Sequence, residues 1–243
     1  ASKTVVLKDG KIEDYFVLPT GWNGRETANA ILEQLITRGY ADAMRCVATG
    51  YGRICVDYAD KIVTEITCHG KGGWAIFKKN MTIIDVGGQD TKMIKVIDGQ
   101  VADFLMNDKC AAGTGKFIEV MATRLGADLN EMYEMAAHGQ PLAISAMCTV
   151  FAESEVISHI GSGEKREDIA AGVIHSVASR VANLAARFGL EENIVLTGGL
   201  CESPYFIQTL SDKIGHPVET DAFARYAGAL GAALTAAKRR DLE

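Results

Sequence analysis

The sequence predicts an α/β protein made of two similar lobes with a cleft between them, and three observations support this prediction. Residues 4–18 read as two strands joined by an Asp-Gly turn. Residues 82–106 repeat this order, with a strand, a glycine turn, a second strand, another Asp-Gly turn and a third strand. Helical patterns follow both strand sets. A duplicated meander followed by helices is typical of a pair of related α/β lobes.

We place the first lobe at residues 1–80 and expect the closing segment 226–243 to pack back on it. A helix is expected from Gly24 to Arg38, because its apolar residues recur on one face. The strand at residues 4–7 has no evident partner on its other side. The further elements expected here are a strand at 46–49, a turn at 50–53, a helix at 64–74 and an alanine-rich helix at 222–237.

The second lobe is expected at residues 81–225 and to carry most of the chemistry. Its predicted strands are 82–90, 92–97, 101–106 and 194–197. Its predicted helices are 115–125, 128–138, 151–161 and 166–188.

Composition excludes several classes of protein. The chain has 243 residues, of which 48% are hydrophobic and 23% charged, and its net charge is -6. These values suit a folded protein with a substantial core and disfavour nonspecific binding to nucleic acid. No run approaches the roughly 18 apolar residues of a membrane span, and the first residues lack the order of a signal peptide. We therefore expect a cytoplasmic protein with neither a nucleic-acid nor a membrane partner.

Two glycine pairs, each at the end of an apolar strand, indicate a nucleotide site. Asp85 ends one such strand and is followed by Gly87, Gly88 and Gln89. Backbone amides at such a turn suit phosphate oxygens, and the carboxylate suits Mg²⁺, although a plain turn with a capping Asp is an equal alternative. The pair Gly198-Gly199 ends the strand at 194–197, and we expect the two pairs to form opposite walls of one site. Gly113 is a weaker candidate, since it also serves to make the chain flexible.

Two of the six cysteines are candidate metal ligands. Cys110 and Cys148 both lie where a glycine-rich or β-rich stretch changes to a helical pattern, and a helix N-terminus stabilises a thiolate. A 4Fe-4S cluster takes four thiolates, so a chain that offers two can complete the set only with a second copy across a two-fold axis. The alternative is that Cys110 and Cys148 are small buried hydrophobic residues without a ligand. We interpret the remaining cysteines in that way, and they are Cys46, Cys55, Cys68 and Cys201.

Two further groups of charged residues lie on predicted helices. Glu153 and Glu155 follow Cys148 in the first turn of a helix, where acidic residues favour the dipole, and one of them is expected to reach the cleft. Arg180 and Arg187 lie seven residues apart on the predicted helix 166–188 and are interpreted as a solvated face rather than a nucleotide contact.

Segments 85–90 (DVGGQD), 106–115 (MNDKCAAGTG) and 148–155 (CTVFAESE) together resemble the activators (component A) of 2-hydroxyacyl-CoA dehydratases, a family that includes the ATP-binding subunits of benzoyl-CoA reductase. Segments 49–53, 197–199 and 226–231 are similar to this family as well, so the resemblance covers almost the whole chain. The NDKCAAGTG string is the most specific part.

The resemblance implies the two-lobed fold of actin, sugar kinases and heat-shock chaperones, with a duplicated ribonuclease-H-like lobe and ATP or ADP with Mg²⁺ in the cleft. It implies a homodimer that holds one 4Fe-4S cluster through Cys110 and Cys148 of each subunit. ATP hydrolysis would then drive a low-potential electron from a donor such as ferredoxin or flavodoxin to a partner dehydratase or reductase in anaerobic metabolism. Asp85 would hold Mg²⁺ or orient water, with Glu153 as a second catalytic carboxylate.

One departure from the family concerns the first lobe. Family members begin with a strand that ends in an Asp-x-Gly-Ser-Thr phosphate loop, whereas this sequence begins at Ala1-Ser2-Lys3, where that loop would finish. The first lobe is therefore expected to lack its first strand and phosphate loop. Two alternatives stay open, a small-molecule kinase on the same fold with incidental cysteines and a nucleotide-gated interaction module without turnover.

Overall fold

The computed structural model describes residues 1–40, 44–107, 109–145 and 148–237, which divide into two compact units. Unit 1 comprises Ala1–Asn80, Val96–Ala102 and Tyr226–Glu243, and unit 2 comprises Met81–Lys95 and Asp103–Arg225. The expected lobe at 1–80 with 226–243 differs from unit 1 by the segment Val96–Ala102. Residues 238–243 of the expected closing segment lie outside the described residues.

Unit 1 begins with a hairpin of β1 (Ser2–Lys8) and β2 (Lys11–Leu18), which pair antiparallel. The predicted Asp-Gly turn is confirmed, because Asp9 and Gly10 both have positive φ, at 52° and 77°. Helix α1 (Gly24–Thr37) begins after Asn23, whose side chain accepts hydrogen bonds from the backbone N–H groups of Arg25 and Glu26. The remaining elements are β3 (Val47–Ala48), η1 (Tyr51–Cys55), β4 (Lys61–Ile62), α2 (Glu65–Phe77) and α8 (Ala227–Ala237).

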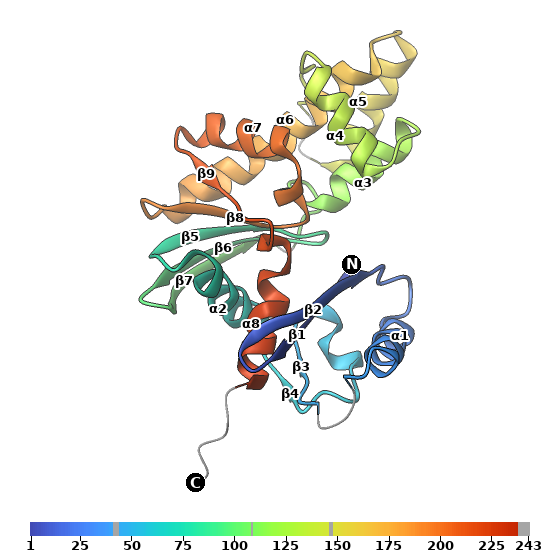
Figure 1. Ribbon diagram of the computed structural model, residues 1–243. Helices are drawn as coiled ribbons and strands as arrows, with labels where there is room; N and C mark the ends of the chain where they lie inside the picture. Colours follow the sequence, from blue (N-terminus) through green and yellow to red (C-terminus); the bar gives the residue numbers. More distant parts are fainter. Residues whose placement is uncertain (41–43, 108, 146–147, 238–243) are drawn as a thin grey trace. The chain divides into compact units, whose positions relative to one another are not determined.

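Helices α2 and α8 of unit 1 pack backbone against backbone (Figure 1). A Cβ added to Gly72 would lie 1.8 Å from the carbonyl oxygen of Ala227, and one added to Gly231 would lie 1.8 Å from that of Cys68. Both positions therefore accept only glycine. Helix α8 also packs on β1, so this late segment of the chain completes the core of unit 1.

A five-stranded sheet has the order β7-β6-β5-β8-β9 and belongs to unit 2 except at Val96–Ala102, where β6 turns into β7. Strand β5 pairs parallel with β8, and β8 pairs parallel with β9. The second predicted Asp-Gly turn, between β6 and β7, is confirmed by positive φ at Asp98 and Gly99. The strands are β5 (Met81–Val86), β6 (Thr91–Ile97), β7 (Gln100–Asn107), β8 (Ile194–Gly198) and β9 (Val218–Glu219).

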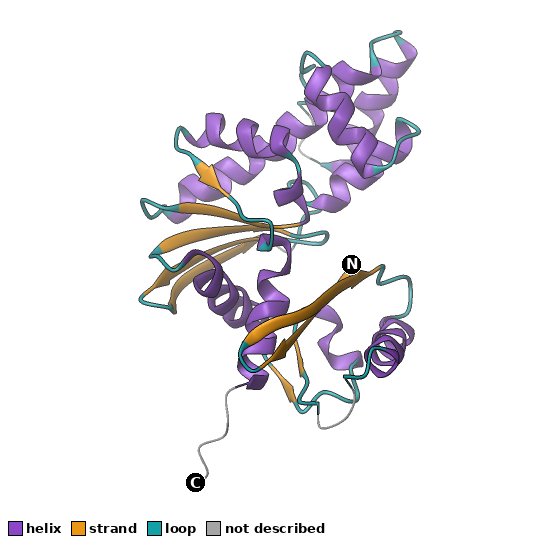
Figure 2. Cartoon of the chain, viewed as in Figure 1, coloured by secondary structure: helices purple, strands orange, loops and turns teal. Residues whose placement is uncertain are grey.

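The helices of unit 2 lie along the sheet and in a separate helical group (Figure 2). They are α3 (Gly115–Arg124), α4 (Leu129–His138), α5 (Thr149–Gly161), α6 (Arg166–Phe188) and α7 (Pro204–Ile214), with the short η2 at Gly199–Glu202 and η3 at Ala224–Tyr226 leading into α8. No element was expected from the sequence where α7 and β9 occur.

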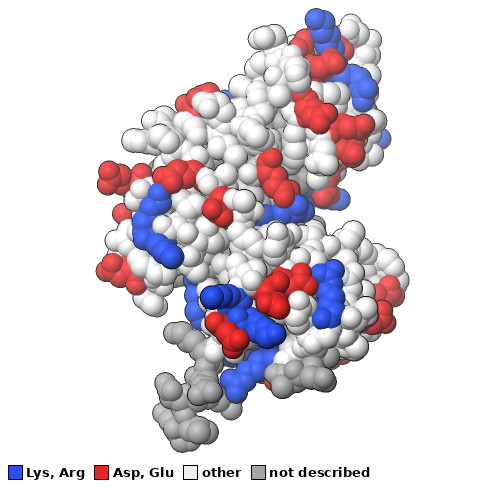
Figure 3. All heavy atoms as spheres, in the orientation of Figure 1, with Lys and Arg blue, Asp and Glu red and all other residues white. Residues whose placement is uncertain are grey.

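Helix α6 is long and apolar enough to cross a membrane by length and composition alone. A core helix meets the same criterion, and 56% of the most apolar window of α6 is buried. It packs against α4 and α7. Lys and Arg side chains and Asp and Glu side chains are both scattered over the face drawn in Figure 3, among residues of other kinds.

Candidate functional site

The two glycine-ended strands lie side by side in unit 2. In the parallel pair of β5 and β8, Asp85 is opposite Thr197 and Val86 is opposite Gly198. The hydroxyl of Thr197 donates a hydrogen bond to Oδ1 of Asp85 at 2.7 Å. The expectation that the two glycine pairs form opposite walls is therefore wrong, because parallel neighbours end at the same edge of a sheet.

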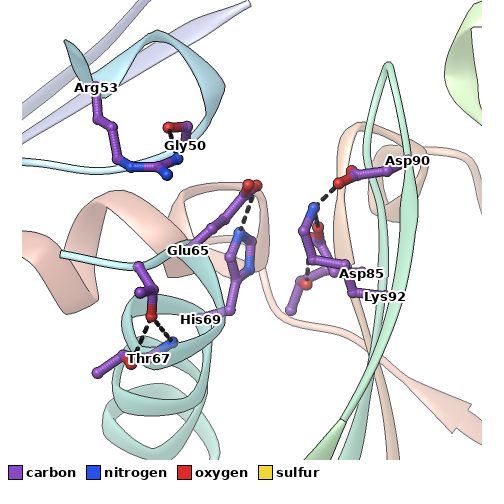
Figure 4. A network of polar contacts seen from close by, with 10 residues as sticks. Gly50, Arg53, Glu65, Thr67, His69, Asp85, Asp90 and Lys92 are labelled. Atoms are coloured by element: carbon purple, nitrogen blue, oxygen red, sulfur yellow. Dashed lines mark hydrogen bonds and ion pairs between the residues drawn. The ribbon is translucent and has the colours of Figure 1, made fainter. Parts of the chain in front are cut away.

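A buried lysine that was not identified from the sequence holds the Asp85 carboxylate. Nζ of Lys92 lies 3.5 Å from Oδ2 of Asp85 and 2.5 Å from Oδ1 of Asp90 (Figure 4). The exposed fractions are 0% for Lys92 and 2% for each aspartate. A lysine is almost never this buried unless it is paired, so the three side chains form one charged unit at the end of β5. The sequence around Lys92 gives no sign of this burial, which follows from the packing of β6 in the sheet.

The first glycine turn is tied to the start of α3. The backbone N–H of Gly115 donates to the carbonyl oxygen of Gly87 at 2.9 Å, and that of Lys116 donates to Gly88 at 3.0 Å. Gly88 and Gln89 are exposed, and a Cβ on Gly88 would meet nothing within 4 Å. The turn is thus anchored on one side and open to solvent at Gly88 and Gln89.

The two residues of the second glycine pair differ in their surroundings: Gly198 is crowded, and Gly199 is open. Gly198 has φ of +88°, and a Cβ there would lie 2.3 Å from the carbonyl oxygen of Val86. Gly199 has nothing within 4 Å of its added Cβ. Gly198 lets β8 lie against β5 at its end, while Gly199 leaves the sheet edge accessible to a ligand.

Gly113 lies in the loop between β7 and α3. Its carbonyl oxygen accepts a hydrogen bond from the hydroxyl of Thr91 at 2.7 Å. Its φ is +87°, and an added Cβ would lie 3.2 Å from Cβ of Arg180. Gly113 therefore fixes the path of the loop that carries Cys110 and lies against α6.

Both candidate cysteines are exposed free thiols, and their positions differ in one respect from the expectation. Cys148 is the N-cap residue of α5, as predicted. Cys110 lies four residues before Thr114, the N-cap residue of α3, so it does not cap a helix. The cause is an intervening turn in which the hydroxyl of Thr114 donates to the carbonyl oxygen of Ala111 at 2.6 Å.

Glu153 forms an ion pair with Arg124, which joins α5 to α3. Glu155 accepts hydrogen bonds from the backbone N–H and the hydroxyl of Ser145. These contacts give both carboxylates a role in holding α5. The catalytic role expected for Glu153 stays a prediction.

The environments of the thiols predict which cysteines react. Burial raises the pKa of Cys46 and of Cys201 to about 11, so both are protonated thiols at pH 8. In metal-free protein at that pH, iodoacetamide is expected to label Cys110 and Cys148 more than about tenfold faster than those two. Peptide mass spectrometry over a time course measures each rate, and equally fast labelling of Cys201 would contradict the burial argument.

A family model, a curated relative and a solved structure each match nearly the whole chain. The model of the BadF/BadG/BcrA/BcrD ATPase family matches residues 2–236. The (R)-2-hydroxyglutaryl-CoA dehydratase activating ATPase of Acidaminococcus fermentans is 42% identical over 245 residues, which cover 98% of this chain and 94% of that protein. The crystal structure of that component A has a TM-score of 0.89 and covers 97% of this chain and 95% of its own.

Two more solved structures are similar to this chain. The activator of 2-hydroxyisocaproyl-CoA dehydratase from Clostridium difficile with bound ADPNP is 40% identical, has a TM-score of 0.88, and covers 96% of this chain and 89% of its own. The ethanolamine utilization protein EutJ from Carboxydothermus hydrogenoformans, at 14% identity, has a TM-score of 0.57 with 91% and 79% coverage and shows likeness of fold alone. The predicted α/β fold of actin-like ATPases is thus confirmed, while the duplication of a ribonuclease-H-like lobe stays a prediction.

Proposed function

Because the chain belongs to the BadF/BadG/BcrA/BcrD ATPase family, we propose that it is an ATP-driven electron-transfer activator of a 2-hydroxyacyl-CoA dehydratase or a related CoA-ester reductase. The observation that carries this proposal is the presence, in one unit, of two exposed free thiols and of a buried carboxylate, Asp85, near the end of a glycine-ended strand that pairs with a second such strand. The relatives whose names describe them as dehydratase activators support the partner.

The thiols fit a 4Fe-4S cluster shared by two copies of the chain. Cys110 and Cys148 are exposed, unlike the buried Cys68 and Cys201, so a second subunit can approach both. Cys148 is the N-cap residue of α5, so its sulfur lies at the end of a helix where the first backbone N–H groups have no partner within the helix. A cluster bound there would supply one-electron transfer.

The strand ends fit a nucleotide with Mg²⁺. The carboxylate of Asp85 is the hard oxygen ligand that Mg²⁺ prefers, and Thr197 and Lys92 hold it in place. The backbone N–H groups of Gly88 and Gly199 lie in open turns at the same sheet edge and suit phosphate oxygens. We assign Gly87, Gly88, Gln89, Gly198 and Gly199 to the cofactor site on this ground. Gly113 and Glu153 are included in the proposal because their segments, 106–115 and 148–155, resemble the family.

The proposal includes a cytoplasmic homodimer that accepts its electron from a donor such as ferredoxin or flavodoxin. A donor and an acceptor protein must each come within electron-transfer range of Cys110 and Cys148. The exposure of both cysteines supports this requirement.

Anaerobic purification followed by iron and sulfide analysis tests the cluster. We expect about four iron atoms per dimer, and loss of the cluster in Cys110→Ser and in Cys148→Ser, because each removes half of one subunit's ligands. Cys55→Ser is the matched control and should retain full iron. A complete cluster in both ligand variants would refute the assignment, and ATP hydrolysis that survives unchanged in Asp85→Asn would refute the nucleotide site.

A further inference from the structure

Helix α6 carries three polar residues along one face, at Arg180, Asn183 and Arg187. They follow one another at intervals of three and four residues, which is the spacing of neighbours on one side of a helix. Arg180 is half-buried, whereas Asn183 and Arg187 are exposed. The expectation that both arginines form a solvated face is therefore wrong for Arg180.

The same three residues line a cavity of about 270 Å³ within unit 2, between α6 and the end of β7. Part of its wall is apolar, since it also contains side chains of Leu105, Met106, Val181 and Leu184. The volume lies slightly below the roughly 300 Å³ at which pockets for drug-sized ligands begin. The cavity therefore suits a small organic molecule with both a polar and an apolar part.

The wall opposite α6 is held in place by hydrogen bonds. The side-chain amide of Asn107 donates to the carbonyl oxygens of Cys110 at 3.2 Å and Ala112 at 3.3 Å. The hydroxyl of Thr91 donates to the carbonyl oxygen of Gly113 at 2.7 Å. A ligand in the cavity thus meets a preformed surface, and it contacts residues on both sides of Cys110 in the chain.

The charge around this cavity has one sign. Two of its described lining residues are arginines and none is acidic, although the whole chain has a net charge of -6. Arg187 has no ion-pair partner in the part of the chain that the structure describes. The site is therefore complementary to an anion.

A second cavity of similar size shows that this charge pattern is not general. Its volume is about 280 Å³, and its lining includes Lys116, Glu119 and Asp128. Nζ of Lys116 lies 3.1 Å from Oε2 of Glu119, so its positive charge is neutralised within the cavity. Nothing there favours an anion.

We propose that the cavity beside α6 binds a small organic anion, either a carboxylate or a phosphate ester that bears a short apolar group. The anionic group pairs with Arg187 and Arg180, because a guanidinium donates two parallel hydrogen bonds to either kind of oxyanion. The apolar group lies against Leu105, Met106 and Leu184. This site is independent of the proposed function, since it uses neither the cluster nor the nucleotide.

Three probes of similar shape test the class of ligand, namely hexanoate, hexyl phosphate and the uncharged hexanamide. Calorimetric titration of the full chain, purified anaerobically, is expected to show at least one anion binding about tenfold or more tighter than hexanamide. Binding of hexanoate alone identifies a carboxylate site, and binding of hexyl phosphate alone identifies a phosphate site. Absence of binding by both anions, or equally tight binding of hexanamide, overturns the proposal.

Variants of Arg187 test the place of binding. Arg187→Gln is expected to weaken binding of the anion about tenfold or more, and Arg187→Lys to weaken it less, because lysine keeps the charge but loses the paired donors. Lys116→Gln, which removes the cation of the second cavity, is the matched control and should bind as the unmodified protein does. Arg187 is exposed, so its variants should fold, and circular dichroism checks this. Unchanged affinity in Arg187→Gln overturns the proposal.

Hydrogen exchange measured by mass spectrometry locates the bound anion directly. With the anion present, exchange is expected to slow in β7 and in the part of α6 around Arg187, and to stay unchanged in α4. Protection confined to the glycine turns after β5 and β8 would place the anion in the proposed nucleotide site instead and would overturn the proposal. Loss of ATP binding in Asp85→Asn with intact binding of the anion would separate the two sites.

Discussion

Replacing Lys92 with methionine is expected to lower the free energy of unfolding by about 3–5 kcal/mol. The substitution keeps much of the volume but leaves the carboxylates of Asp85 and Asp90 buried without the cation that lies 2.5 Å from one and 3.5 Å from the other. Because Asp85 belongs to the proposed nucleotide site, ATP affinity should fall as well. Urea unfolding followed by circular dichroism measures the first effect, and calorimetric titration with ATP and Mg²⁺ measures the second.

A double variant distinguishes electrostatic destabilisation from poor packing. Asp90→Asn removes one of the two buried negative charges, so Lys92→Met combined with Asp90→Asn should be less destabilised than the sum of the single variants. If Lys92→Met alone unfolds at the same urea concentration as the unmodified protein, the lysine does not neutralise the aspartates. Simple additivity in the double variant would indicate that the two side chains act independently.

Replacing Gly72 with alanine is expected to destabilise unit 1 by about 3 kcal/mol or more, the upper end of the effects of overpacking. The added Cβ would lie 1.8 Å from the carbonyl oxygen of Ala227, and a backbone atom inside α8 cannot rotate away as a flexible side chain can. Gly231→Ala should have the same effect, since its Cβ meets the carbonyl oxygen of Cys68 equally closely. Thermal unfolding measures both changes.

Gly161→Ala is the matched control for these two variants. Gly161 is the last residue of α5, and an added Cβ would meet nothing within 4 Å. Alanine has a higher helix propensity than glycine by up to about 1 kcal/mol, so this variant should be neutral or slightly more stable. A melting temperature for Gly72→Ala equal to that of Gly161→Ala would show that α2 and α8 do not meet at these glycines.

Local signals in the sequence were enough to predict the longer strands, both Asp-Gly turns and the place of Asp85 near the end of β5. These features depend on residues close together in the chain, as when Asp98 and Gly99 adopt the left-handed conformations that a two-residue turn requires. The place of the segment Val96–Ala102 in unit 1 could not be predicted, for the opposite reason. Its tip lies against α2, where the ring of Trp74 comes within 3.2 Å of a Cβ added to Gly99, and such tertiary packing has no local signature.

In the candidate site, too, the features that depend on neighbouring residues could be predicted and those that depend on tertiary packing could not. Asp85 and its glycines form a local motif, whereas the pairing of Asp85 with Thr197 joins residues 112 positions apart. The role of Lys92 follows only from burial, since nothing in the segment around it reveals that the strand is covered on both faces. Arg180 is similar, because a charged residue on a long amphipathic helix usually faces water.

The packing of α8 on α2 and β1 also determines the order in which the protein can fold during its synthesis. Residues 81–225 leave the ribosome before α8 does, so unit 2 can form its sheet while unit 1 still lacks one helix. At ordinary elongation rates this interval lasts on the order of ten seconds. Throughout it, the face of α2 around Cys68 and Gly72 lacks the helix that covers it in the folded protein.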